Sequence, residues 1–307
     1  MLFGRYTFLS EFSNQAILPP YKGSTLRGAF GLALKDISCV LKSNDCQGCP
    51  LVKTCVYYRV FETDSESTDK KSGAQPHVFV IEPPNSTQQN FAPGERFDFR
   101  VLLFGFANDL VPYFVYAFEE VGKTGLGKFL GGRRAAYKLL KVTSESAPVF
   151  DSLDRMVKPG LAKELELDTS NHDPNPVLRL TIRLETPLRL KFNNLFSEDL
   201  PFHVLVRAML RRIASLNNSF GQGEPQIDYS GLVNRSQNVN VVDSNLKWLD
   251  WSRFSNRRQT EMKLGGLVGD ITYSGHLQEY MCLIKYCQLV HVGKNTTFGL
   301  GKISIKT

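Results

Sequence analysis

The sequence contains no uninterrupted apolar stretch of about 18 residues, the length that a membrane-spanning helix needs. Its first residues alternate in character and include Arg5 and Glu11, which is unlike a secretory signal peptide. We therefore expect no membrane span and a cytoplasmic location.

The sequence also lacks the patterns that mark several common enzyme sites. No cluster of Asp, Glu and His has convincing metal-ligand spacing, which disfavours a metal-dependent nuclease. Two basic segments are rich in glycine, but neither contains Gly-x4-Gly-Lys-Ser/Thr, and each precedes a strand-like run instead of opening a helix. A Walker phosphate loop and a Rossmann turn are therefore excluded.

Acidic residues are outnumbered, with 30 Asp and Glu against 37 Lys and Arg, which gives a net charge of +7. An excess of this size favours nucleic acid or another anionic surface as a partner. The imbalance is local, because residues 122–142 and 280–307 contain no acidic side chain at all.

The 307 residues suffice for two domains of about 100–200 residues each. Hydrophobic periodicity predicts the order strand, helix, strand, strand, helix, strand twice. The expected elements are 3–11, 23–37, 77–82, 96–104, 108–121 and 134–142, then 177–186, 200–216, 239–251, 264–273, 276–289 and 300–306. This order predicts an α+β chain of two tandem ferredoxin-like (β-α-β-β-α-β) domains, residues 1–143 and 176–307, with a linker over 144–175.

A cysteine-rich insertion in the first domain is a candidate metal site. Cys39, Cys46, Cys49 and Cys55 could enclose one tetrahedral zinc ion, and the x2 spacing between two of them suits a metal knuckle. The alternative is unligated or partly buried thiols. Four thiolates would fill the coordination shell, so we expect a structural zinc and no catalytic metal.

The two glycine-rich segments are candidate RNA-binding loops. Glycine lets a backbone approach a bulky ligand, and exposed amides beside basic side chains suit phosphate oxygens. The candidate residues are Lys123, Lys128, Arg133 and Arg134 in the first segment, and Gly293, Gly299, Gly301 and Lys302 in the second.

Two places carry candidate catalytic residues. His291 could transfer a proton and Lys294 could stabilise a crowded phosphate during RNA cleavage by the 2′-hydroxyl. Alternatively, His291 only holds the loop or contacts RNA without chemistry. Lys22 and Arg27 lie at the start of the first predicted helix, where a phosphate could bind, although capping explains the neighbouring residues equally well.

Four stretches carry a resemblance to a known family. They are Tyr21–Gly31 (YKGSTLRGAFG), the run Cys55-Val56-Tyr57-Tyr58, Met262–Ser274 (MKLGGLVGDITYS) and His291–Gly301 (HVGKNTTFGLG). Together they resemble the CRISPR repeat-processing endoribonucleases of the RAMP superfamily, in the branch with a cysteine-bearing N-terminal half. The resemblance covers nearly the whole chain.

The resemblance implies two tandem ferredoxin-like domains and metal-independent cleavage of CRISPR precursor RNA within each repeat. Attack by the 2′-hydroxyl would leave a cyclic phosphate and a 5′-hydroxyl, with the closing glycine-rich loop holding the repeat RNA near the cut. The implied partners are CRISPR repeat RNA and other CRISPR-associated subunits.

The sequence departs from the family in one respect. Many members carry a catalytic histidine in or near the first helix, and residues 21–38 contain none. Lysine or arginine serves in some relatives, so Lys22 or Arg27 could act together with His291. Relatives also include RNA-binding subunits without processing activity, which is the alternative function.

Overall fold

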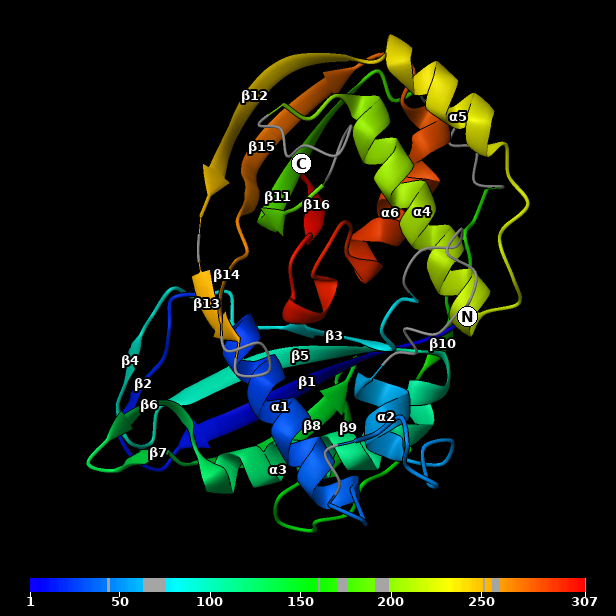
Figure 1. Cartoon of the computed structure of the whole chain (residues 1–307). Helices are drawn as coiled ribbons and strands as arrows, with labels where there is room; N and C mark the ends of the chain where they lie inside the picture. The colour runs from blue at the N-terminus through cyan, green and yellow to red at the C-terminus, as the bar shows by residue number, and fades with distance from the viewer. Residues whose placement is uncertain are drawn as a thin grey trace. The chain divides into compact units, whose positions relative to one another are not determined.

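The computed structural model describes residues 1–42, 45–62, 75–159, 161–169, 176–190, 199–250, 252–255 and 260–306. The chain divides into two compact units, Met1–Leu165 and Glu166–Thr307, and each contains a main antiparallel sheet (Figure 1). Within the described ranges, no helix is long and apolar enough to cross a membrane.

The main sheet of the first unit has the strand order β3-β5-β1-β8-β9. Central strand β1 pairs antiparallel with β5 on one side and with β8 on the other. Side chains alternate along a strand, and in β1 Tyr6, Phe8 and Phe12 are buried while the residues between them are less so, apart from Ser10. The strands are β1 (Leu2–Phe12), β3 (Phe79–Glu82), β5 (Arg96–Phe104), β8 (Tyr137–Ser144) and β9 (Ala147–Asp151).

An aromatic layer holds two helices, α1 (Gly23–Ser38) and α3 (Val111–Thr124), against this sheet. Phe30 of α1 stacks on Phe114 and Phe118 of α3, with ring centroids 4.9 and 5.1 Å apart. Phe118 also contacts Phe8 of β1 at 5.1 Å. Each such pair contributes roughly 0.5–1.5 kcal/mol beyond the burial of its area.

Shorter elements complete the first unit. Strands β2 and β4 form one two-stranded sheet, and β6 and β7 form a hairpin. The elements are β2 (Ala16–Ile17), α2 (Val56–Phe61), β4 (Asn90–Phe91), the 3-10 helix η1 (Gly105–Leu110), β6 (Leu126–Leu130), β7 (Arg133–Ala135) and β10 (Lys163–Glu164).

The second unit has a sheet in the order β12-β15-β11-β16. Helix α4 buries Leu205, Met209, Ile213 and Leu216, which recur at helical spacing along one stripe. The main elements are β11 (Arg179–Leu188), α4 (Phe202–Phe220), β12 (Asn240–Leu249), β15 (Gly266–Ser274), α6 (Met281–Val290) and β16 (Ile303–Lys306). The smaller ones are α5 (Tyr229–Arg235), η2 (Ser236–Asn238), β13 (Ser252–Ser255), β14 (Thr260–Lys263), η3 (Gln278–Tyr280) and η4 (Thr296–Phe298).

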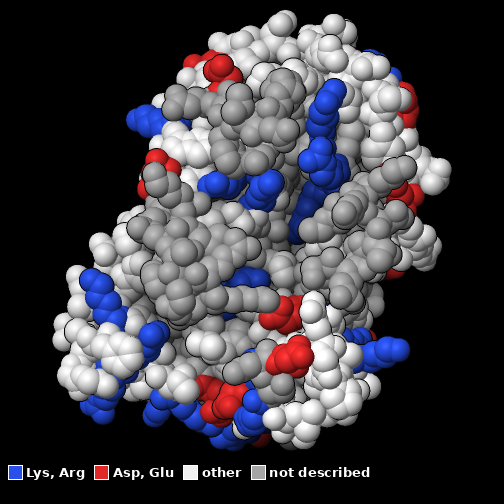
Figure 2. All heavy atoms as spheres, in the orientation of Figure 1, with Lys and Arg blue, Asp and Glu red and all other residues white. Residues whose placement is uncertain are grey.

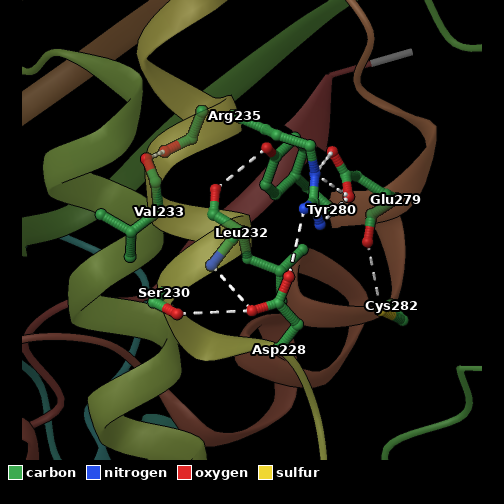
Figure 3. A network of polar contacts seen from close by, with 10 residues as sticks. Asp228, Ser230, Leu232, Val233, Arg235, Glu279, Tyr280 and Cys282 are labelled. Carbon is green, nitrogen blue, oxygen red and sulfur yellow. Dashed lines mark hydrogen bonds and ion pairs between the residues drawn. The ribbon is translucent and has the colours of Figure 1, made fainter.

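A polar network ties α5 to η3, the 3-10 helix that precedes α6 (Figure 3). The carboxylate of Asp228 caps α5 by accepting from the amide of Gly231 at 2.8 Å. Arg235, at the other end of α5, donates to Asp228 at 3.2 Å and to both carboxylate oxygens of Glu279. The bidentate pair links the C-terminal end of α5 to Glu279 with a defined planar geometry.

Each predicted strand and helix has a counterpart in the structure, and the mixed α/β class with antiparallel sheets is confirmed. Across each sheet, the four predicted strands of that half lie in the order second, third, first, fourth along the chain. These are β3-β5-β1-β8 in the first unit and β12-β15-β11-β16 in the second. The division after Leu165 falls inside the predicted linker, and β9 and β10 from that segment pair with the first sheet. The sequence analysis missed these two strands because each is short and lacks sustained alternation.

Candidate nucleic-acid interface

The closing loop, residues 291–302, connects α6 to β16 and is hydrogen-bonded to the end of β11. The amide of Lys294 donates to the carbonyl of Arg189 at 3.1 Å, and the amide of Gly301 donates to the carbonyl of Pro187 at 3.1 Å. The loop therefore has a defined conformation, and these backbone donors are already paired.

Thr186 of β11 adds two further bonds to this loop. Its hydroxyl donates to the carbonyl of Gly299 at 2.8 Å and accepts from the amide of Lys302 at 2.9 Å. A single side chain thereby satisfies a donor and an acceptor at the buried side of the loop.

The glycines of the closing loop serve close packing. Gly301 has φ +75°, and a Cβ atom there would collide with the carbonyl of Val292. Gly293 has φ +88°, and its Cβ would lie 2.8 Å from the carbonyl oxygen of Arg189. The amide of Gly299 donates to Thr296 O at 2.7 Å. Exposed amides were the reason for expecting RNA contacts here, and the amides of Gly299 and Gly301 are paired internally, so RNA binding by these glycines stays a prediction.

His291 begins the loop and is fully buried. Its Nδ1 lies 3.0 Å from the carbonyl oxygen of Leu300, and since that oxygen can only accept, the ring donates. Its φ of +61° is uncommon for a residue other than glycine. The ring therefore bridges the two ends of the loop, and contact with RNA would require it to be uncovered.

A partly buried arginine supports the same corner. Nε and Nη2 of Arg212 donate to the carbonyl of Val290, the last residue of α6, at 3.2 and 2.9 Å. Burial lowers the pKa of Arg212 to about 10, so the guanidinium stays charged near neutrality. A cation at a helix C-terminus is also favoured by the helix dipole.

The cations of the closing loop differ in access. Lys294 is exposed. The ammonium of Lys302 lies 3.7 Å from a carboxylate oxygen of Glu185, and its side chain is only 20% exposed. Lys294 is therefore the better placed of the two to meet a phosphate.

At the start of α1, Lys22 is enclosed and Arg27 is partly exposed. The ammonium of Lys22 donates to Ser86 O at 2.7 Å and to Pro20 O at 3.2 Å, and burial lowers the pKa of this lysine. The guanidinium of Arg27 lies 4.4 Å from the ring centroid of Phe61. Both cations therefore contribute to packing in the first unit, and their predicted catalytic roles stay predictions.

The basic residues predicted in the first glycine-rich segment gather at the β6–β7 hairpin and the end of α3. Lys128, Arg133 and Arg134 are exposed on the hairpin. Lys123, at the end of α3, forms an ion pair with Glu120 at 2.5 Å. Figure 2 shows lysine and arginine side chains around uncharged atoms at this corner of the first unit.

The four clustered cysteines lie between α1 and the start of α2, and all are partly exposed. Burial raises the pKa of the Cys46 thiol, while the nearby charge of Lys35 opposes this and those of Glu62, Cys39 and Cys55 add to it. Within the part of the chain that the structure describes, no three or more His, Cys, Asp or Glu side chains are placed to hold one metal ion. The structural zinc therefore stays a prediction.

One cationic stripe was missed in the sequence. His203, Arg207 and Arg211 follow each other at four-residue spacing on α4, and the two arginines are exposed. Burial, and then the charge of Arg207, lowers the pKa of His203. The spacing is visible in the sequence, but it becomes a stripe only once these residues are placed on one helix.

Comparison with known families covers most of the chain. The model AF_1859_N, described as an N-terminal domain, matches residues 1–161, and the chain belongs to that family. The model of the CRISPR-associated endoribonuclease Cas6 matches residues 182–303, which include the closing loop. Residues 182–303 therefore carry a Cas6-type domain. An uncharacterized protein of Archaeoglobus fulgidus is 22% identical to this chain, covering 94% of it and 93% of the relative.

Several solved structures share the fold of this chain. A Cas6 product complex matches with a TM-score of 0.57 and 15% identity over 100% of both chains. Thermus thermophilus Cas6 matches with a TM-score of 0.57 and 12% identity over 99% of this chain and 98% of that one. A partial Cas6-RT-Cas1–Cas2 complex matches with a TM-score of 0.61 and 14% identity over 99% of this chain, which spans only 46% of the matched chain.

Proposed function

We propose that this protein cleaves CRISPR precursor RNA within its repeats, without a catalytic metal, by attack of the 2′-hydroxyl on the adjacent phosphate. The observation that carries the proposal is the Cas6 match over residues 182–303 together with a fixed closing loop that presents an exposed Lys294. The net charge of +7 supports a polyanionic substrate.

We further propose that both units are ferredoxin-like domains in tandem. The same order of four strands and two helices occurs in each half, and each main sheet has the corresponding strand order. Repeat RNA is the proposed substrate, and other CRISPR-associated proteins are the proposed partners. Solved relatives include a Cas6 product complex and a Cas6-RT-Cas1–Cas2 complex, which is consistent with both.

In the proposed reaction Lys294 provides positive charge for the phosphate as it becomes crowded and more negative. The buried, bonded ring of His291 favours a positioning role, in which it holds the loop that carries Lys294. Lys22 and Arg27 remain candidate catalytic residues of the first unit. The cysteine cluster has no step in the reaction.

The direct test is incubation of the full chain with its host's CRISPR repeat RNA in excess EDTA. We expect one cut per repeat, with a 5′-hydroxyl on the downstream product and a cyclic phosphate on the upstream one. End-group analysis by mass spectrometry measures both. A cut that requires added divalent metal, or a downstream 5′-phosphate, would contradict the proposed chemistry.

Two substitutions at His291 separate its positioning role from proton transfer. Asparagine tolerates a positive φ and can donate to the carbonyl of Leu300, but it cannot serve as an acid or base near neutrality. We expect His291→Asn to retain most of the single-turnover cleavage rate and the thermal stability, whereas His291→Ala loses both. A loss of roughly 100-fold or more in the rate of His291→Asn, with unchanged stability and RNA affinity, would instead make His291 catalytic.

A second function is favoured by the enclosure of two predicted catalytic side chains, Lys22 and His291. On this alternative the protein holds repeat or guide RNA and cuts nothing. Tight binding of repeat RNA without product, at several pH values and with EDTA or Mg²⁺, would support this alternative over cleavage.

A further inference from the structure

The β6–β7 hairpin ends in a tight turn that exposes an aromatic ring. Gly131 and Gly132 have φ +57° and +81°, which fits a two-residue hairpin turn of the kind that needs positive φ at both positions. Phe129, just before the turn, is 65% exposed. Among the phenylalanines whose side chains the structure describes, Phe129 alone is exposed.

The hairpin is fixed at its base, so the ring is presented by a defined support. Leu126 and Ala135 pair across the strands and are buried. Gly127 packs closely on β2, where a Cβ atom would collide with the carbonyl of Ile17. The amide of Ala136 donates to the side chain of Asn14 at 2.9 Å.

Arginine already covers one face of the exposed ring. The guanidinium carbon of Arg134 lies 4.9 Å from the ring centroid of Phe129, a cation–π arrangement. Since the ring is 65% exposed, much of it remains open to a ligand. Phe129 and Arg134 therefore form a short stack onto which a further planar group can be added.

The charge around the stack favours a nucleic acid as that ligand. Lys128 and Arg133 are also exposed on this hairpin, and none of the described acidic side chains forms an ion pair with Lys128, Arg133 or Arg134. A protein or lipid surface could cover an apolar ring, but three exposed cations on one short hairpin, with Arg134 at the ring itself, match a phosphate chain with a base between its charges.

We propose that the β6–β7 hairpin binds one unpaired nucleotide of the RNA, whose base stacks on Phe129 while Lys128 and Arg133 contact the flanking phosphates. This assignment rests on the proposed function, because it takes repeat RNA as the ligand. It adds a base-stacking residue to a segment for which the sequence predicted only phosphate contacts. Stacking accepts any base, so the hairpin recognises an unpaired position in the strand and not a particular sequence.

A double-mutant cycle between the ring and the base tests the proposal. Repeat RNA is prepared with a single abasic nucleotide at each unpaired position in turn, and binding is measured with the full chain and with Phe129→Leu. We expect Phe129→Leu to weaken binding of intact RNA by about 5- to 150-fold. At one position the abasic RNA should bind wild-type protein equally weakly and show no further loss with Phe129→Leu.

Three control variants separate base stacking from loss of charge and from a general loss of aromatic surface. Phe129→Tyr retains a flat ring and should bind like the wild type. Arg133→Ala should reduce the salt dependence of binding by about one phosphate contact, whereas Phe129→Leu leaves it unchanged. Tyr113→Ala removes another exposed aromatic side chain, on α3, and should bind like the wild type.

Independent losses from Phe129→Leu and from every abasic substitution would overturn the proposal, as would unchanged affinity of Phe129→Leu. The cleavage assay tests the proposed function independently of the binding cycle. Cleavage of intact RNA by Phe129→Leu at saturating protein leaves that function standing even if the stack is refuted. Absence of cleavage by the wild type refutes the function, while a coupled cycle would still support the stack.

Discussion

Repeat RNA with hydrogen in place of the 2′-hydroxyl at the scissile position is expected to bind normally and to remain uncut. In the proposed reaction that oxygen forms the new bond to phosphorus, and the 5′-oxygen leaves with a proton. Without the hydroxyl there is no nucleophile, so the protein cannot compensate by positioning or charge. Single-turnover assays in EDTA, with end-labelled RNA that is deoxy only at this position, measure the effect.

The matched substrate for this experiment carries the same replacement one nucleotide away. It should be cut at close to the normal rate, because it retains the attacking oxygen. Cleavage of RNA that is deoxy at the scissile position would mean that water attacks instead. The proposed chemistry would then be wrong even if the products formed at the expected site.

Gly301→Ala is expected to have the largest effect of any single-methyl addition to the closing loop. The backbone at φ +75° disfavours alanine by roughly 1–2 kcal/mol, and the added Cβ would collide with the carbonyl of Val292. Because that contact is with backbone, the loop must move. We expect the free energy of unfolding to fall by about 2–4 kcal/mol. Thermal unfolding and RNA cleavage, measured on the same preparation, should both decline.

Gly94→Ala provides the matched control for conformational strain alone. Gly94 has φ +82°, and an added Cβ would have nothing within 4 Å. This variant should lose only the backbone preference, about 1–2 kcal/mol, and should cleave RNA normally. Equal losses of stability in the two variants would show that the close approach of Gly301 to Val292 adds nothing.

Hydrophobic periodicity was sufficient to predict the main elements of both units. The stripe of Leu205, Met209, Ile213 and Leu216 identifies α4, because these residues recur on one face of a 3.6-residue period. The short strands β9 and β10 could not be predicted in this way. Their pairing with the first sheet depends on backbone groups of β8 and β1 that are distant in sequence, or that meet only after a turn.

The candidate site was likewise predicted only in part from the sequence. Glycine, lysine and arginine in residues 122–134 and 291–302 identified two unusual segments. In the structure the first is the end of α3 with the β6–β7 hairpin, and the second is a loop that contains η4. The sequence could not distinguish Lys294, which is exposed, from Lys302, which lies beside Glu185. It also gave no sign that the ring of His291 is buried or that the ring of Phe129 is open.

By itself the sequence determined the repeated order of elements, the cationic character and the positions of the glycine turns. These properties depend on residue type and on spacing along the chain, both of which are local. Only the tertiary structure decided which cations remain exposed and which amides are already paired. Those outcomes depend on what residues far apart in the sequence, such as Thr186 and Gly299, place against each other. Burial and hydrogen bonding are therefore set by the packed chain and not by the segment that carries the motif.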